Sequence, residues 1–272
     1  MRSNPGSSAH HGEGGLENAL AATEEDAEAA LAVAKRLQSV VAAARKAAAR
    51  GDLRAMRRAL SGAEDALADA AEAIGQLREG WSLSEEDEIQ LLASGAYTQE
   101  LIRRGKDAGL AIYDQDGVLS SYPSLVRMLP RQLAVSVDRK PNRHIRPSAL
   151  VAHLSALQNS EPALSVERFA ETLHGAYRVI APEPGAMVRL FDIHSTLTLL
   201  PAAAREYGLQ EFARDVYLLD RSGHATTRSG AQIRLSAGAT SARDRRNLLV
   251  VVTREGVEKS YYGVEFVGGT TR

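Results

Sequence analysis

The 272-residue chain contains no cysteine, one tryptophan and few other aromatic residues. The lack of cysteine excludes disulfide bonds, thiolate metal sites and a cysteine nucleophile, so any metal would need oxygen or imidazole ligands. No charge excess is present either: 33 Lys and Arg nearly balance 34 Asp and Glu, and we expect no attraction of the whole molecule to nucleic acid or anionic lipid. Residues 248–252 form one of the longest aliphatic runs, which is far short of the about 20 residues that span a bilayer.

Residues 1–15 are polar and glycine-rich, and they predict a disordered tail. They lack the apolar core of a secretory signal and do not resemble a transit peptide. We therefore expect a cytoplasmic protein without membrane contact. The chain length allows two or three small domains.

Two apolar series with alternating steps of three and four residues flank Gly51 and Asp52. Such spacing puts each series on one face of a helix. Gly51 can end the first helix in the left-handed conformation, and Asp52 can cap the second. Residues 16–80 therefore predict an antiparallel, coiled-coil-like helical hairpin. The series comprise Leu16, Leu20, Thr23, Ala27, Ala30, Ala34, Leu37, Val41, Ala44 and Ala48, then Leu53, Met56, Leu60, Ala63, Leu67, Ala70, Ile74 and Leu77.

Alanine dominates the apolar series of the first helix and buries little area, at about 25 cal/mol per Å². We therefore expect the hairpin to pack on something else, most simply a second copy in a homo-oligomer. Basic residues surround the turn and acidic residues gather at the open end. The basic group is either a solvated face or a contact for phosphate or an acidic protein partner. It comprises Arg45, Lys46, Arg50, Arg54, Arg57 and Arg58, and the acidic group Glu24, Glu25, Asp26, Glu28, Glu72 and Glu79.

The segment 81–160 predicts a helix, a small β-meander and a second helix. The first helix is expected at 82–106, with Ser82 and Glu85 as its capping box. Short β-type runs at 110–113, 118–122, 125–129 and 133–137 are separated by turn residues. Pro147 suits the first position of a helix that ends near Asn159.

The segment 161–272 predicts a third part, so the chain as a whole is expected to be α+β. Helices are expected at 166–180, 195–200 and 209–219, with a strand-like stretch at 187–191 between the first two. Strands are expected at 232–236, 248–253 and 259–267.

This order resembles a winged-helix module, most closely between Val188 and Gly223. The resemblance implies DNA binding with the last helix in the major groove and the wing on the backbone, although many such modules bind only proteins. The last helix is poorly charged for DNA, because Glu211, Asp215 and Asp220 oppose two arginines. The segment 221–259 holds eight basic and three acidic residues. Its candidate phosphate contacts are Arg228, Arg243, Arg245 and Arg246.

An enzymatic alternative joins Asp116 to Asp138 and Lys140. Restriction-endonuclease-like nucleases are similar in placing one acid before an Asp-x-Lys, so that two carboxylates hold Mg²⁺ or Mn²⁺ and the lysine steadies the attacking water. Asp114 and Asp116 also resemble the first motif of haloacid-dehalogenase-like phosphatases. Both stretches equally fit hairpin turns, since Asp-Gln-Asp-Gly and Asp-Arg-Lys-Pro are turn sequences.

We favour a non-enzymatic, self-associating accessory or adaptor protein without cofactors that contacts DNA or a DNA-processing partner. In this hypothesis the hairpin mediates assembly and the wing arginines contact phosphate. The alternatives are the metal-dependent nuclease and a protein–protein scaffold without DNA contact.

Overall fold

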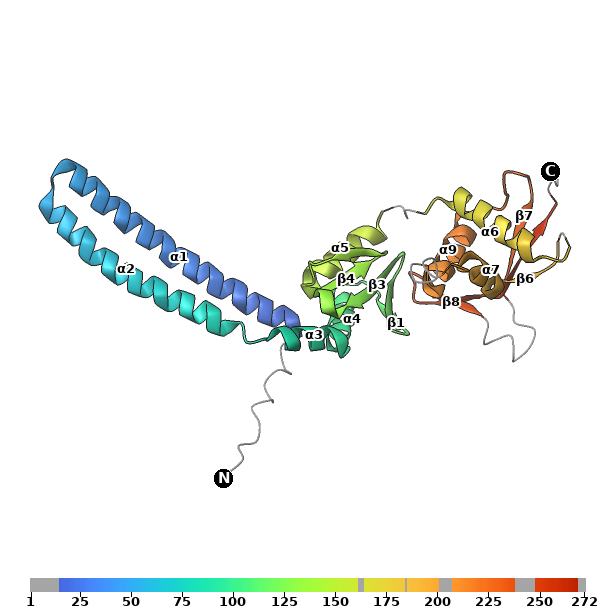
Figure 1. The fold of residues 1–272 in the computed structure, drawn as a ribbon, viewed down its shortest axis with the longest axis horizontal. Helices are drawn as coiled ribbons and strands as arrows, with labels where there is room; N and C mark the ends of the chain where they lie inside the picture. The colour runs from blue at the N-terminus through green and yellow to red at the C-terminus, as the bar shows by residue number, and fades with distance from the viewer. Residues whose placement is uncertain (1–14, 161–163, 184, 201–206, 238–247, 269–272) are drawn as a thin grey trace, which may run out of the picture. The chain divides into compact units, whose positions relative to one another are not determined.

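The computed structural model describes residues 15–160, 164–183, 185–200, 207–237 and 248–268. It confirms the α+β class, with two long paired helices followed by small antiparallel sheets (Figure 1). The chain forms two compact units, one of residues up to Glu100 together with Arg146–Ser148, the other of Leu101–Ile145 and the residues from Ala149 onwards. Segments predicted as separate domains at 81–160 and 161–272 thus contribute largely to one unit. In the described ranges, no helix is long and apolar enough to cross a bilayer.

Helices α1 (Gly15–Arg50) and α2 (Leu53–Gly80) pack antiparallel along each other (Figure 1), which confirms the predicted hairpin. The Asp52 side chain accepts a hydrogen bond from Ala55 N at 3.0 Å and so caps α2. Gly51 has φ +70°, a conformation that residues with a side chain rarely adopt. Both residues of the turn therefore act as their sequence predicts.

The face of α2 that contacts α1 differs from the predicted series by a shift of one position at three places. Ala59, Ala66 and Ala73 lie inward in place of Leu60, Leu67 and Ile74. Ala66 and Ala70 are buried, and Ala59 and Ala73 are half-buried, whereas the leucines that follow the alanines are exposed. Alanines at the contact let two helix backbones approach closely, whereas leucines at the same positions would hold them apart. The inward residues of α2 are Met56, Ala59, Ala63, Ala66, Ala70, Ala73 and Leu77; those of α1 are Ala30, Val33, Leu37, Val40, Ala44 and Ala47.

The open end of the hairpin is held by two buried glutamates. The Glu100 carboxylate accepts hydrogen bonds from Leu16 N at 2.8 Å and Glu17 N at 3.1 Å, so it caps the start of α1. Glu17 in turn accepts from Arg146 Nε at 2.8 Å and from Ser148 N at 2.8 Å. Buried carboxylates are tolerated where charged or N–H partners satisfy them, as here.

The helix predicted at 82–106 is divided into α3 (Glu85–Ala93) and α4 (Ala96–Asp107). Gly95, with φ +82°, lies at the break between them. The capping box lies two residues later than predicted, between Ser84 and Asp87. Sequence spacing alone did not distinguish the two serines.

The predicted meander is a five-stranded antiparallel sheet in the order β1-β2-β3-β4-β5. Its strands are β1 (Tyr113–Gln115), β2 (Val118–Ser121), β3 (Ser124–Leu129), β4 (Ala134–Val137) and β5 (Lys140–Asn142), and the 3-10 turn η1 (Pro130–Gln132) precedes β4. The fifth strand was not predicted, because it is short and contains Pro141. Proline is tolerated on an edge strand, which β5 is. Helix α5 (Pro147–Gln158) begins at Pro147 as expected.

The rest of the described chain packs three helices on a three-stranded sheet (Figure 1). The helices are α6 (Val166–Ile180), α7 (Leu190–Leu197) and α9 (Leu209–Ser222). Strand β10 (Gly263–Val267) lies between β6 (Val188–Arg189) and β7 (Gln232–Ser236), and β8 (Leu249–Val252) pairs with β9 (Glu258–Tyr261) in a separate hairpin. Helix α7 starts five residues before the predicted position, directly after β6. The core around Phe169, Leu173 and Phe212 lies between the helices and the sheet.

We expect Ala66→Leu to destabilise the hairpin by about 1–3 kcal/mol, because the added methyl groups have no space at a fully buried contact between two helices. Thermal unfolding followed by helical circular dichroism on the full chain measures this loss. Ala68→Leu, at an exposed position of the same helix, is the matched control and should unfold within about 0.5 kcal/mol of the parent. Equal losses in both variants would contradict the alanine contact.

Candidate interaction surfaces

One side of the hairpin is apolar and exposed. Leu53, Leu60, Leu67 and Ile74 recur every seven residues along α2 and are each 51–60% exposed. A seven-residue repeat of large aliphatic side chains is typical of a helix that packs along another helix. In the described hairpin these four side chains have no such helix on them, since α1 lies against the alanines instead.

Two exposed residues of α1 lie on the same side. In an antiparallel helix pair, residues that follow the inward positions share one side, and residues that precede them share the other. Leu31 follows Ala30 and Val41 follows Val40, just as the leucines of α2 follow its alanines, and both are more than half exposed. We call Leu31, Val41, Leu53, Leu60, Leu67 and Ile74 the apolar side of the hairpin.

The opposite side of the hairpin is polar. Arg36 precedes Leu37 and Asp69 precedes Ala70, and these two charged residues form an ion pair at 2.8 Å across the helices. All six basic residues of the predicted group at the turn are exposed. We call them the basic tip. The acids Glu24, Glu25, Glu28, Glu72 and Glu79 of the open end are also exposed, and Asp26 is half-buried.

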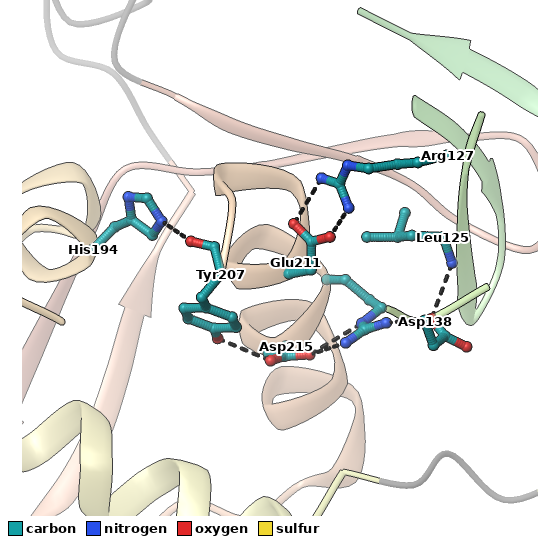
Figure 2. Close-up of polar contacts among 8 residues, drawn as sticks. Leu125, Arg127, Asp138, His194, Tyr207, Glu211 and Asp215 are labelled. Carbon is teal, nitrogen blue, oxygen red and sulfur yellow. Dashed lines mark hydrogen bonds and ion pairs between the residues drawn. The ribbon is translucent and has the colours of Figure 1, made fainter. Parts of the chain in front are cut away.

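Helix α9 contacts the five-stranded sheet through a network of ion pairs (Figure 2). Glu211 of α9 is 2% exposed and forms a two-pronged ion pair with Arg127 of β3, with Nη2 to Oε2 at 2.8 Å. One turn later, Arg214 bridges Asp138 at 2.6 Å and Asp215 at 2.9 Å. Paired charges of this kind are costly to separate, because each partner would be left desolvated.

Three further polar contacts extend this network of ion pairs. Tyr207 donates a hydrogen bond to Asp215 Oδ2 at 2.8 Å, and its carbonyl oxygen lies 3.0 Å from His194 Nε2 (Figure 2). Burial and the neighbouring Asp215 carboxylate raise the pKa of Tyr207, so the phenol stays protonated and acts as the donor. Asp138 also accepts a hydrogen bond from Leu125 N at 3.1 Å.

Most of helix α9 is therefore covered. Eight of its fourteen residues are buried, and Tyr122 of the sheet segment packs edge-on against Tyr217 with ring centroids 5.4 Å apart. This is the helix that a winged-helix module would place in the DNA major groove. In this fold its polar residues instead bind the chain's own β-meander.

The described part of the basic segment 221–259 is partly neutralised within the protein. Lys259 Nζ lies 2.6 Å from Asp220, and Arg221 stacks over the Tyr122 ring at 5.4 Å. Arg228 is exposed, and its backbone N–H donates to Glu171 at 2.6 Å. Arg243, Arg245 and Arg246 lie outside the described residues.

The structure places Asp116 and Asp138, the carboxylates of the nuclease alternative, in different turns. Asp116 and Asp138 lie in the β1–β2 and β4–β5 turns, which the antiparallel order of the strands puts at opposite ends of the sheet. Both turns need residues with positive φ, and Asp116, Asp138 and Arg139 supply them. Lys140 is exposed, and Asp138 is already bound by Arg214 and Leu125 N. Asp114, the nucleophile of the phosphatase resemblance, accepts from Gly117 N as a turn residue.

A cavity of about 800 Å³ opens beside this network. Apolar residues such as Val137, Leu157 and Leu218 line it together with Arg139 and His153. Its volume is within the range of small-molecule sites, and its lining contains carboxylates of Asp138 and Asp215 as well as cationic side chains.

A scan of the chain against protein-family models, a search of curated proteins and a search of solved structures each returned no match.

We expect Arg127→Met to destabilise the second unit by roughly 2 kcal/mol, because it leaves the Glu211 carboxylate buried without its partner. Adding Glu211→Gln should restore part of the loss, since the neutral amide is cheaper to bury. Urea unfolding of the two variants and the parent gives the three free energies.

The control is Arg189→Met, which removes an ion pair with Asp192 whose side chains are 48% and 39% exposed. It should cost less than about 1 kcal/mol. If Arg127→Met cost no more than this control, the ion pair to α9 would not stabilise the fold.

The Asp220 carboxylate should make stability depend on pH. Partial burial raises its pKa, but hydrogen bonds from Lys259 and Tyr261 outweigh burial and hold the pKa below its usual value of 3.8. The stabilisation is therefore complete above pH 3.8 and is lost as the pH falls through the folded-state pKa. Asp220→Asn should lower the melting temperature by roughly 2–4 °C at pH 7.

The difference between Asp220→Asn and the parent should shrink in melts recorded below pH 3.8. Asp107→Asn, at an exposed carboxylate of α4, serves as control and should melt like the parent throughout. A difference for Asp220→Asn that stays constant down to pH 2 would contradict the lowered pKa.

Proposed function

We propose that the protein is a non-enzymatic adaptor that self-associates through the apolar side of its hairpin. The observation that carries the proposal is the exposed seven-residue repeat of Leu53, Leu60, Leu67 and Ile74. Single exposed apolar residues are ordinary, but a continuous row of them along a long helix marks an interaction surface.

The composition of the hairpin supports the same conclusion. Its inner contact is made mostly of alanine, so each inward residue buries little apolar area. Leu53, Leu60, Leu67 and Ile74 of α2 face outward, and covering them would add apolar burial to the hairpin. Association would thus complete the core that the hairpin lacks.

The contacts of the second unit support an adaptor role over catalysis by Asp116, Asp138 and Lys140. Helix α9, which the winged-helix resemblance would place in DNA, binds the β-meander through Arg127 and Asp138. This use of α9 favours a module that binds protein over one that inserts a helix into DNA.

The test of self-association is the mass of the full chain by light scattering. The parent should elute with a mass well above 29.2 kDa, and the double variant Leu60→Glu, Leu67→Glu should be monomeric, because charges cannot be buried unpaired in an apolar contact. The matched control places the same charges one residue later, at the exposed positions Ser61 and Ala68, and should keep the parent mass. A monomeric parent would overturn the proposal.

Contact with a DNA duplex through the wing is a second candidate function. The observation that favours it is the excess of basic over acidic residues in segment 221–259, of which Arg228 is exposed. Such contacts would go to phosphate and would not require α9 to enter a groove.

Fluorescence anisotropy with a labelled duplex over a salt titration tests this candidate. Reversing Arg243, Arg245 and Arg246 to Glu should abolish binding, because each lost phosphate contact lowers the salt slope by about 0.9. The control reverses Arg103, Arg131 and Arg143, which are exposed outside the wing, and should bind as the parent does. Unchanged binding in the wing variant would show that the wing arginines do not contact the duplex.

A further inference from the structure

We propose that two copies of this chain pair along the apolar side of the hairpin in antiparallel orientation, so that the basic tip of each copy lies against the acidic open end of the other. This inference rests on the proposed function, since it presupposes self-association. It goes further by naming the occupant of the apolar side, a second copy of the same hairpin, and by fixing which end meets which.

Symmetry leaves two ways to pair the apolar sides of identical hairpins. A twofold axis in the plane of the contact can run along the hairpin or across it. An axis along the hairpin puts tip beside tip and packs α2 of one copy on α1 of the other. An axis across the hairpin reverses one copy and packs α2 on α2. Both arrangements bury the same leucines, so burial does not choose between them.

The leucine row of α2 fixes the register of the crosswise arrangement. The row runs from Leu53 to Ile74, and reversal about its midpoint pairs Leu60 of one copy with Leu67 of the other. The same reversal brings the turn at Asp52 level with position 75 of the second copy. This register follows from the aliphatic residues alone, without reference to charge.

The acidic residues lie at the level that this register selects. Arg36 pairs with Asp69, and Asp26 closely approaches Gly80, so the position of α1 level with 75 falls at about Ala30, within one turn of Glu28. The exposed acids Glu24, Glu25, Glu28, Glu72 and Glu79 all lie within two turns of it. Two independent patterns, the leucines and the charges, therefore agree on one arrangement. Pairing tip beside tip would instead crowd twelve cations together.

The positive charges at the start of α2 would destabilise this helix on its own. Its first turn contains Arg54 and no acid, although a positive charge near a helix N-terminus is unfavourable with the helix dipole. Arg57 and Arg58 extend the positive charge into the second turn. Carboxylates of a reversed second copy would turn this unfavourable placement into an attraction.

Cross-linking of single-cysteine variants of the full chain tests the orientation. The chain has no cysteine of its own, so an introduced thiol is unique. Glu64→Cys lies near the midpoint of the leucine row and is exposed. In the crosswise arrangement α2 lies on α2, and a short bis-maleimide should link Glu64→Cys protein to itself. Ser61→Cys, which faces away from the apolar side, is the control and should not be linked.

A mixture with Gln38→Cys protein detects the other arrangement. Gln38 lies near the same level on α1 and is exposed, so an axis along the hairpin would link position 64 only to position 38. That result in a dimeric protein would overturn the antiparallel inference and leave self-association standing. A monomeric chain that gives no links would overturn both.

A charge reversal supplies a second readout. Reversing Arg54 and Arg57 to Glu places acid against acid in the crosswise arrangement and should weaken self-association at least tenfold. Mixing with Glu24→Lys, Glu28→Lys protein should restore pairing. With tip beside tip, the same reversal would reduce the repulsion between the two tips and should strengthen self-association, so an affinity equal to or above that of the parent would contradict the inference.

Discussion

The close contact of alanines between α1 and α2 is the constraint on which the hairpin depends. Ala66 and Ala70 let the two helices approach, and Leu60 and Leu67 of α2, which follow Ala59 and Ala66, are left outside. Such a pair has little apolar volume at its centre and gains little free energy from burial. The same residues that fix the contact between α1 and α2 thereby create the surface from which we infer self-association.

The second unit differs from the hairpin because it buries charged side chains as well as apolar area. Glu211 and Asp215 lie on the buried length of α9, and each is satisfied by an arginine, Arg127 or Arg214. Helix α9 is thus specific for the β-meander by its charges, while Phe212 and Val216 serve the core on its other side. The charged side chains of α9 are therefore paired within the protein. Within the described chain, the hairpin is the surface with more exposed apolar side chains for a partner to contact.

The sequence predicted elements well where one periodicity or one cap decides the structure. The hairpin turn at Gly51 and Asp52, the start of α5 at Pro147 and the bounds of α6 follow from local rules. The sequence could not decide which of two neighbouring apolar stripes of α2 faces α1, because alanine and leucine both count as apolar in a pattern. It also could not show that Arg127 meets Glu211, since the two lie 84 positions apart. Asp116 and Asp138 looked like ligands because turn residues and metal ligands share the same side chains.

Sedimentation equilibrium of the full chain over a range of protein concentrations is the decisive measurement of self-association. A chain that pairs through the apolar side of its hairpin should show a mass about twice 29.2 kDa that falls towards the monomer on dilution. A mass of 29.2 kDa at every concentration would contradict it, because the leucine row of α2 would then have no second copy to cover it.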